Sequence, residues 1–414
     1  MTVVEFFDKV SIDNMVSCIT MEPDKIIFIG DKKTMNKYKS HYENFIRKKK
    51  LDVTLEYINI NRNSISNVVG ILEKIVLEDD YCVFDLTGGE DLVLVAMGIV
   101  YERYKDEKQI QMHRFNISTG SIFDCDSDGI IPYEGEPEIT VEDNISLYGG
   151  TLMRNSKYDT HLWQLTDEFV DDVMALWHLC KRNPGRWNAM INTVAAVISL
   201  DSGENGLYLT ASRTEIANKM KKKGQEFAWV EDVADELVKL GVIAGLEDSG
   251  EYISFAIKDH QIKRLLRKSG TILEVAILIL SLTCKDPEGN AVYTDAETGV
   301  YIDWDAMIHT GSESIKDTVN EVDVVLMHGL QPVFISCKNG RVEDEELYKI
   351  KAVAERFGGP YVKTVLVCSY MGNVPEESKI HIRQRAKDMD IDVIEGVHEI
   401  SDDDIRKKLR KIVL

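Results

Sequence analysis

The chain lacks the features that mark secreted and membrane-spanning proteins. Its seven cysteines are scattered and include no CxxC pair, which argues against a zinc ribbon or a disulfide framework and predicts reduced thiols. The longest apolar run, Val275 to Leu280, is far shorter than the roughly 20 residues that a membrane span needs. The opening MTVVEFFDKV mixes acids with apolar residues and predicts no signal peptide. We therefore expect a cytoplasmic protein with no membrane contact.

Basic residues are scarce relative to acidic ones. The 414 residues include 49 Lys and Arg against 70 Asp and Glu, which gives a formal net charge of -21. Such a chain cannot bind nucleic acid tightly through bulk electrostatics, so any such site has to be local or metal-bridged. The remaining composition, 44% hydrophobic and 29% charged, is that of a globular protein.

Hydrophobic periodicity predicts three domains, over residues 1–150, 151–265 and 266–414. The first part alternates apolar runs with amphipathic stretches, which is typical of a parallel α/β sheet. The second has short helices followed by the hairpin-like GLEDSGEYISFAI, the outline of a winged helix. The third mixes strands and helices again. The predicted strands are 25–30, 51–60, 81–88 and 110–117 in the first domain, and 322–327, 332–338, 362–369 and 391–396 in the third.

Two residues of the third domain suit phosphodiester hydrolysis. Asp323 lies in the strand NEVDVVLMHG, and Lys338 follows fifteen residues later at the end of FISCKNG. Two antiparallel strands joined by a short turn bring these positions together. A carboxylate can hold a divalent ion that acidifies water, and a lysine can stabilise phosphorane charge. Glu274, in an otherwise apolar helix over 270–280, is a further metal-ligand candidate. The competing interpretation is an ordinary strand carboxylate with a surface lysine.

These residues carry a family resemblance. NEVDVV and PVFISCKNG resemble the PD-(D/E)xK nuclease core of the CARF-domain ancillary nucleases of type III CRISPR systems, in which a cyclic-oligoadenylate sensor precedes the nuclease. The resemblance implies a Rossmann-like CARF domain, a winged-helix-like connector and a restriction-endonuclease-like domain. It implies Asp323, Glu274, Lys338 and Ser336 as the catalytic set, with Mn²⁺ or Mg²⁺ at the two acids. Ser336 departs from the family's second acid, and Glu343, Glu345 and Glu346 in the following helix are candidate replacements.

The first domain carries a nucleotide-like turn. Thr87-Gly88-Gly89 follows an apolar strand and precedes a helix, where backbone amides and the helix N-terminus favour phosphate. Ser11 and Asn14 follow the first strand and suit contacts to bases or riboses, although either residue would also cap a helix. The resemblance implies that the two loops line a groove at the two-fold axis of a homodimer. That groove would bind one cyclic oligoadenylate, which we expect to be cyclic tetra-adenylate.

Two other functions remain open at this point. Arg154 and His161 fit the R-x6-H spacing of HEPN ribonucleases, which act without metal. A ligand-controlled transcription regulator would use the winged-helix-like part, although Lys219 and Lys221 to Lys223 are typical of a solvated face. Because the acidic chain disfavours a duplex, we expect a nuclease that cuts single-stranded DNA or RNA.

Overall fold

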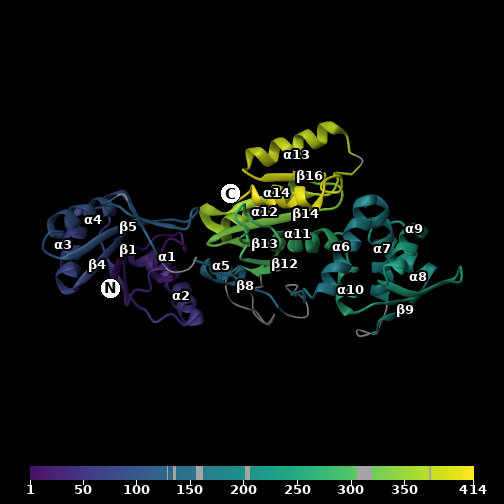
Figure 1. Cartoon of the computed structure of the whole chain (residues 1–414), viewed down its shortest axis with the longest axis horizontal. Coiled ribbons are helices and arrows are strands. Elements are labelled where there is room, and N and C mark those ends of the chain that lie inside the picture. Colours follow the sequence, from purple (N-terminus) through teal and green to yellow (C-terminus); the bar gives the residue numbers. More distant parts are fainter. Residues whose placement is uncertain (128, 134–136, 155–161, 201–205, 305–318, 373) are drawn as a thin grey trace.

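The computed structural model describes residues 1–127, 129–133, 137–154, 162–200, 206–304, 319–372 and 374–414. The molecule is elongated, and its C-terminal domain lies between the other two, although it comes last in the sequence (Figure 1). Of the described residues, no helix is both long and apolar enough to cross a lipid bilayer.

The N-terminal domain is a Rossmann-like sheet in the order β3-β2-β1-β4-β5-β6-β7. The first five strands along the sheet are parallel. Because helices cover both faces, the central strands are almost entirely apolar and buried, as in KIIFIG. The strands are β1 (Thr2–Phe6), β2 (Lys25–Gly30), β3 (Thr54–Asn59), β4 (Tyr81–Asp85), β5 (Gln109–Asn116), β6 (Ser121–Asp124) and β7 (Ile130–Ile131). The helices are α1 (Val16–Thr20), α2 (Lys32–Lys49), α3 (Ile65–Glu78) and α4 (Asp91–Tyr104).

A short segment connects this sheet to the C-terminal domain. Helix α5 (Val141–Leu147) begins at a capping box formed by Thr140 and Asp143. Strand β8 (Thr151–Leu152) then pairs with β12 (Asp295–Asp303) at the edge of the C-terminal sheet. The chain therefore contributes to the last domain before it enters the middle one.

The middle domain is winged-helix-like, as predicted. Its antiparallel sheet has the order β10-β11-β9 and follows two long helices. The elements are α6 (Asp167–Arg182), α7 (Pro184–Leu200), β9 (Tyr208–Ser212), α8 (Arg213–Lys222), α9 (Glu231–Lys239), β10 (Ile243–Asp248), β11 (Tyr252–Ile257) and α10 (His260–Leu265).

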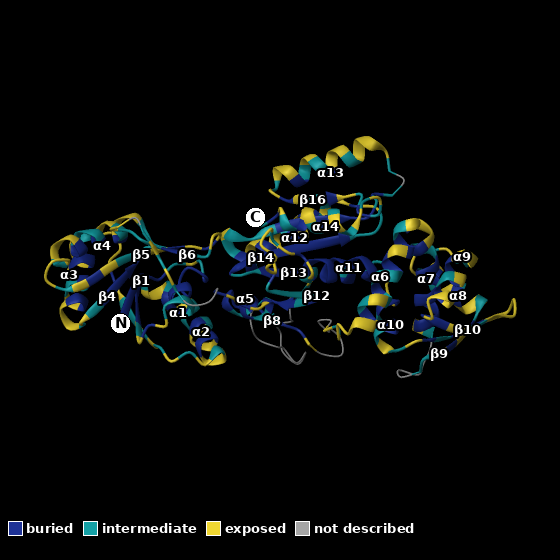
Figure 2. Ribbon diagram, in the orientation of Figure 1, coloured by how far each residue is buried: buried dark blue, intermediate teal, exposed yellow. Residues whose placement is uncertain are grey.

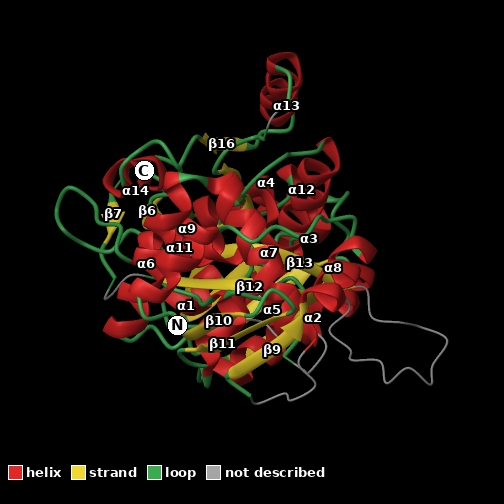
Figure 3. Ribbon diagram, turned by 90° about the vertical axis from the view of Figure 1, so that its right-hand side faces the viewer, coloured by secondary structure: helices red, strands yellow, loops and turns green. Residues whose placement is uncertain are grey.

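The C-terminal domain is built on a mixed sheet in the order β16-β15-β14-β13-β12-β8. The predicted strands are present, and β12 is an additional strand that the sequence pattern does not predict. Helix α13 stands away from the body of the molecule (Figures 1 and 3). The remaining elements are α11 (Thr271–Leu282), β13 (Val319–His328), β14 (Gln331–Lys338), α12 (Asp344–Gly358), the 3-10 turn η1 (Gly359–Tyr361), β15 (Lys363–Cys368), α13 (Glu376–Asp388), β16 (Asp392–Glu395) and α14 (Asp402–Arg410).

The two faces of the C-terminal sheet belong to different hydrophobic cores, and buried residues run through the centre of the molecule (Figure 2). On one face, Val324 and Ile335 pack with α11 and with the middle domain's α6 and α7. On the other face, Val325 and Phe334 pack with α5 and α12, and this core continues into the N-terminal domain through residues such as Phe28. The C-terminal domain thus shares one core with each neighbour.

Candidate active site

The β13–β14 hairpin positions the candidate carboxylate. Val324 lies opposite Ile335 in the antiparallel register, so Asp323 and Ser336 are the next facing pair. The Asp323 carboxylate accepts a hydrogen bond from the Cys337 amide at 2.7 Å and one from Ser336 Oγ at 3.2 Å. Burial raises the pKa of Asp323, although the Lys338 charge and the Cys337 amide favour its ionised form. Ser336, which stands where the family motif has its second acid, therefore orients the Asp323 carboxylate.

Lys338 ends β14 beside the first turn of α12. Its Nζ lies 3.0 Å from Glu346 Oε2. Burial opposes the charge on Lys338, but Asp323 and Glu346 outweigh it and raise the pKa of the lysine. Of the three acids considered as replacements for the motif acid, Glu346 is the one paired with Lys338, whereas Glu343 pairs with Arg341 and Glu345 with Lys349.

Glu274 lies in the first turn of α11, between buried apolar neighbours. Burial and the charge of Asp323 raise its pKa to about 8, against the opposing effect of Lys268 and Lys338. A carboxyl group with so high a pKa is costly to ionise in isolation, and a cation placed beside it would lower that cost. Because the charges of Asp323 and Lys338 act on Glu274, the three groups form one electrostatic unit.

Glu274, Asp323 and Lys338 line one pocket of about 510 Å³. Its lining also includes Glu321, Lys268 and Asn339. Among the described residues, no group of three or more His, Cys, Asp or Glu side chains converges closely enough to hold a metal ion alone. Mg²⁺ is commonly bound through only one or two carboxylates, with water and substrate phosphate completing its coordination. The oxygen donors of Glu274 and Asp323 in a polar pocket fit such an ion.

The two predicted sensor loops meet at the carboxyl edge of the N-terminal sheet. Strand β1 pairs with both β2 and β4, so the order of the strands reverses here, and such switch points are where open α/β sheets bind ligands. A Cβ on Gly88 would lie 3.4 Å from the Asp13 Cβ in the first loop. Gly89 has a φ of +134°, and a Cβ there would lie 2.8 Å from Leu94 Cδ2. Gly89 therefore adopts a backbone conformation that residues with a Cβ rarely adopt, whereas the position of Gly88 leaves room for ordinary contact.

The polar side chains predicted to contact the ligand form hydrogen bonds with other groups of the protein. Asn14 donates from Nδ2 to the Asp8 carbonyl and to the Tyr42 hydroxyl, each at 2.8 Å. Ser11 is buried and accepts from the same tyrosine at 3.4 Å. Thr87 Oγ1 accepts from the Phe115 amide at 2.8 Å. Neither Ser11 nor Asn14 caps a helix, and both hold the loop in place.

Three buried acids lie at this edge, and the sequence pattern does not indicate that they come together. Glu5 on β1 faces Asp85 on β4 across the parallel register, and Asp13 lies in the first loop. All three are buried, and burial raises the pKa of each, that of Asp13 to about 7. Asp85 accepts hydrogen bonds from the Thr87 amide at 2.7 Å and from Ser17. Their burial depends on tertiary packing, which a single sequence does not display.

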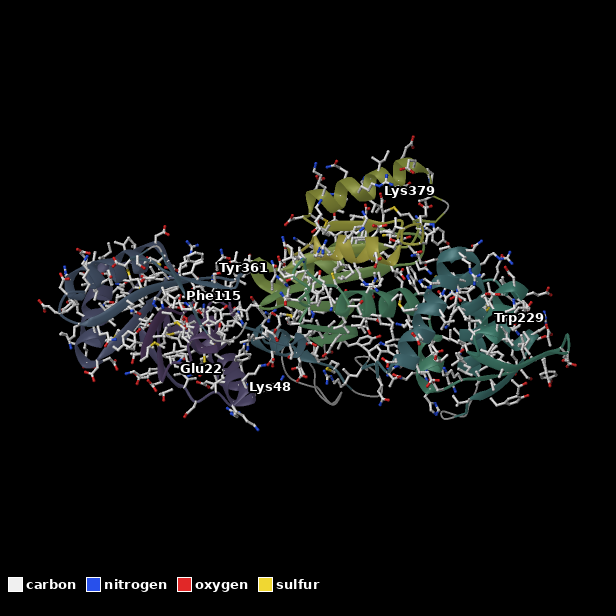
Figure 4. The ribbon with its side chains drawn as sticks, viewed as in Figure 1. Glu22, Lys48, Phe115, Trp229, Tyr361 and Lys379 are labelled. Atoms are coloured by element: carbon white, nitrogen blue, oxygen red, sulfur yellow. The ribbon has the colours of Figure 1, made fainter. Side chains whose placement is uncertain are left out.

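The carboxyl edge of the N-terminal sheet also contacts the C-terminal domain. Tyr361, at the end of η1, lies close enough to Asp13 for the two groups to shift each other's pKa: the Tyr361 hydroxyl lowers that of the Asp13 carboxyl, and Asp13 raises that of the tyrosine. Tyr361 also lines a pocket of about 570 Å³ together with Thr87, Arg114 and Phe115. Tyr361 and Phe115 lie at the junction of the two domains (Figure 4). Helix α12 thus connects Glu346, which lies beside Lys338, to the turn η1, whose Tyr361 lies next to Asp13 in the first loop.

The alternative ribonuclease pair is described only in part. Arg154 forms ion pairs with Glu142 and Glu297, each at 3.3 Å. His161 lies outside the described residues.

With this geometry established, comparisons with known proteins identify part of the chain. Residues 293–414 match the family model of the Card1-like endonuclease domain. The C-terminal domain is therefore of a nuclease type. The Card1-like match includes Asp323, Ser336 and Lys338, while Glu274 lies N-terminal to it. No curated protein matches the chain.

Solved structures share the fold of the whole chain. Protein VC1899 from Vibrio cholerae matches 99% of this chain over 97% of its own length, with a TM-score of 0.72 and 15% identity. Can2 from Sulfobacillus thermosulfidooxidans, solved in complex with cyclic tetra-adenylate, matches 100% over 99% of its length, with a TM-score of 0.65 and 14% identity. A type III CRISPR defence DNA nuclease activated by cyclic oligoadenylate matches 91% over 46% of its length, with a TM-score of 0.51 and 14% identity. The predicted resemblance to CARF-linked nucleases is confirmed.

Proposed function

We propose that this chain is a cyclic-oligoadenylate-activated, metal-dependent endonuclease of type III CRISPR defence that cuts single-stranded DNA or RNA. The observation that carries the proposal is the convergence of Glu274, Asp323 and Lys338 on one polar pocket of a Card1-like endonuclease fold. Phosphodiester hydrolysis requires stabilisation of negative charge on the phosphate and an activated water, and this set of residues can provide both.

Each residue has a role that follows from its contacts. Asp323 and Glu274 would hold Mg²⁺ or Mn²⁺, which when bound supplies a Lewis acid and lowers the pKa of water. The Cys337 amide and Ser336 fix the carboxylate of Asp323 in one orientation. Lys338, kept cationic by Asp323 and Glu346, would stabilise the charge that develops on the scissile phosphate.

The activator would bind where the sensor loops meet. The Thr87-Gly88-Gly89 turn precedes α4, so its amides and the helix N-terminus suit a phosphate. Can2, which shares the fold, was solved with cyclic tetra-adenylate, and we take the same ligand as the activator here. A cyclic ligand made of identical nucleotides has a symmetry that fits a dimer, in which each chain contributes the same two loops. We therefore propose a homodimer that binds one ligand at its two-fold axis.

The deciding experiment is one cleavage panel. Single-stranded and duplex DNA and RNA are incubated with the full chain, with Mn²⁺ or EDTA, and with or without cyclic oligoadenylates of each ring size. We expect cutting only with metal and activator, and its loss in Asp323→Ala and Lys338→Ala. Lys379→Ala on α13, whose side chain pairs with Glu376 outside the pocket, is the matched control.

Two results would contradict the proposal. Folded Asp323→Ala and Lys338→Ala variants that cut at the wild-type rate would refute the site. Cutting that resists EDTA but is lost in His161→Ala would establish the metal-independent ribonuclease in its place.

A further inference from the structure

The pocket around Glu274, Asp323 and Lys338 is not enclosed by the endonuclease domain alone. Helix α7 of the middle domain forms one wall, with Asn192, Ala195 and Ala196. The turn after α8 adds Lys223 and Gln225, and the linker into α11 adds Arg267 to Gly270. The middle domain is therefore part of the candidate active site, beyond the role of connector that the sequence predicts.

This wall is fixed against the catalytic strand. Asn188 on α7 donates from Nδ2 to the Asn339 carbonyl at 2.5 Å, and Asn339 donates from Nδ2 back to Asn188 Oδ1 at 2.9 Å. Asn339 directly follows Lys338. At the end of α8, Gly224 has a φ of +70°, and the amides of Lys223 and Gln225 both donate to the carbonyl of buried Met220. The backbone of Lys223 is thus held at a defined place beside the pocket.

Two cations of this wall pair with no acid among the residues that the structure describes. Lys268 lies 3.1 Å from Glu321, Lys338 pairs with Glu346, and Arg341 pairs with Glu343 at 3.5 Å. By contrast, Lys223 and Arg267 are exposed and form no ion pair with any residue in the described ranges. In a chain with a net charge of -21, two unpaired cations in a pocket with three carboxylates mark a local path for an anion.

We propose that Lys223 and Arg267 bind the phosphates that flank the scissile bond of a single nucleic-acid strand, which runs along the seam between the middle and endonuclease domains. This inference rests on the proposed nuclease function and adds the substrate path. Arg267 can form two parallel hydrogen bonds to one phosphate, and Lys223 provides a point charge. Because both contacts are to the backbone, they fix the position of the strand without reading its sequence.

The seam favours a single strand. A duplex carries closely spaced phosphates on both strands, and its binding depends on neutralising many of them. Two cations in a pocket of about 510 Å³ can engage only a few neighbouring phosphates. A flexible single strand can place those phosphates against the wall while the rest of its backbone avoids the acidic surface.

The test compares two double variants with the same change in charge. Lys223→Gln/Arg267→Gln removes the cations of the wall, and Lys221→Gln/Lys222→Gln removes two exposed cations of α8 that do not line the pocket. The probe is a fluorescein-labelled single-stranded DNA oligonucleotide of mixed sequence. Its KM and kcat are measured with Mn²⁺ and cyclic tetra-adenylate, and its Kd is measured by anisotropy with Ca²⁺ over a range of salt concentrations.

We expect the wall variant to raise KM and Kd about tenfold with little change in kcat, because two exposed charge contacts are lost and an exposed contact contributes less than a buried one. The slope of log Kd against log salt should fall by about 1.4, because each phosphate contact on a single strand contributes about 0.7. Unchanged KM, Kd and slope, or the same changes in the α8 control, would overturn the inference while leaving the nuclease intact. A wild-type protein that binds the oligonucleotide through this wall but never cuts it would refute the nuclease function and support the path.

Discussion

Replacing Glu274 with glutamine is expected to stabilise the metal-free protein and to weaken its response to metal. The side chain lies between buried Leu273 and Val275, and burial together with the Asp323 charge raises its pKa from 4.5 to about 8. Glutamine has the same length and keeps hydrogen-bonding capacity, but it never ionises. The variant therefore removes an electrostatic cost without opening a cavity.

The direction of the pH dependence follows from that pKa. Below pH 4.5 the acid is neutral in the folded and the unfolded chain, so it contributes no penalty. Between pH 4.5 and about 8 the unfolded chain releases the proton while the folded protein retains it, so the wild type loses stability as the pH rises. At about 1.4 kcal/mol per pKa unit, the loss at pH 7 is at most about 3.5 kcal/mol. Water in the open pocket screens part of the penalty, so we expect about 1–2 kcal/mol in favour of Glu274→Gln.

Urea unfolding in EDTA at pH 5, 7 and 8.5 measures this difference. The advantage of the variant should be small at pH 5 and larger at pH 7 and 8.5, and Mn²⁺ should then stabilise the wild type but not the variant. Glu321→Gln changes another acid of the same pocket, one that is exposed and paired with Lys268. It should be stabilised less than Glu274→Gln, because the Glu321 charge raises the pKa of Glu274 by less than burial does. A Glu274→Gln protein less stable than wild type at pH 8.5 in EDTA would refute the reasoning.

Four further results are expected. Glu346→Gln should reduce kcat at least tenfold, because it removes the acid beside Lys338, whereas Glu345→Gln should cut like the wild type; equal rates in the two variants would rule out a special role for Glu346. Gly89→Ala should abolish activation by cyclic tetra-adenylate, since a residue with a Cβ is strained at its φ of +134° and would displace the Leu94 side chain. Calorimetry on the wild type should give one ligand per two chains, a ratio that one ligand per chain would disprove. In a cleavage assay at equal salt and Mn²⁺, a single strand should be cut faster than a duplex of equal length, and the reverse order would show the substrate preference to be wrong.

The parts of the site that sequence predicts are those set by local geometry. Asp323 and Lys338 lie on consecutive strands joined by a tight turn, so their positions follow from the alternation of side chains and the short connection. The Thr87-Gly88-Gly89 turn is likewise recognisable because a buried strand precedes it and a helix follows. In both cases the residues that matter are close together in the chain.

The parts that sequence misses depend on contacts between distant segments. Asn192 and Lys223 reach the pocket from another domain, and nothing in their local pattern distinguishes them from solvated surface residues. The sequence does not predict strand β12 because the segment carries several acids. Two of them have partners in distant segments: Asp295 accepts from the Val141 amide at 2.7 Å, and Glu297 pairs with Arg154. Neither partner adjoins these acids in the sequence.

The continuous core between the N-terminal and C-terminal domains couples their folding equilibria. Phe28 of the N-terminal sheet and Phe334 of the C-terminal sheet belong to one buried cluster, so unfolding of either domain exposes apolar surface of the other. A ligand that binds only the folded sensor adds RT ln(1 + [L]/Kd) to the stability of the whole unit, about 2.7 kcal/mol at a hundredfold excess over Kd. The lifetime of the folded endonuclease domain, and with it its resistance to proteolysis, would then rise with the concentration of the signal.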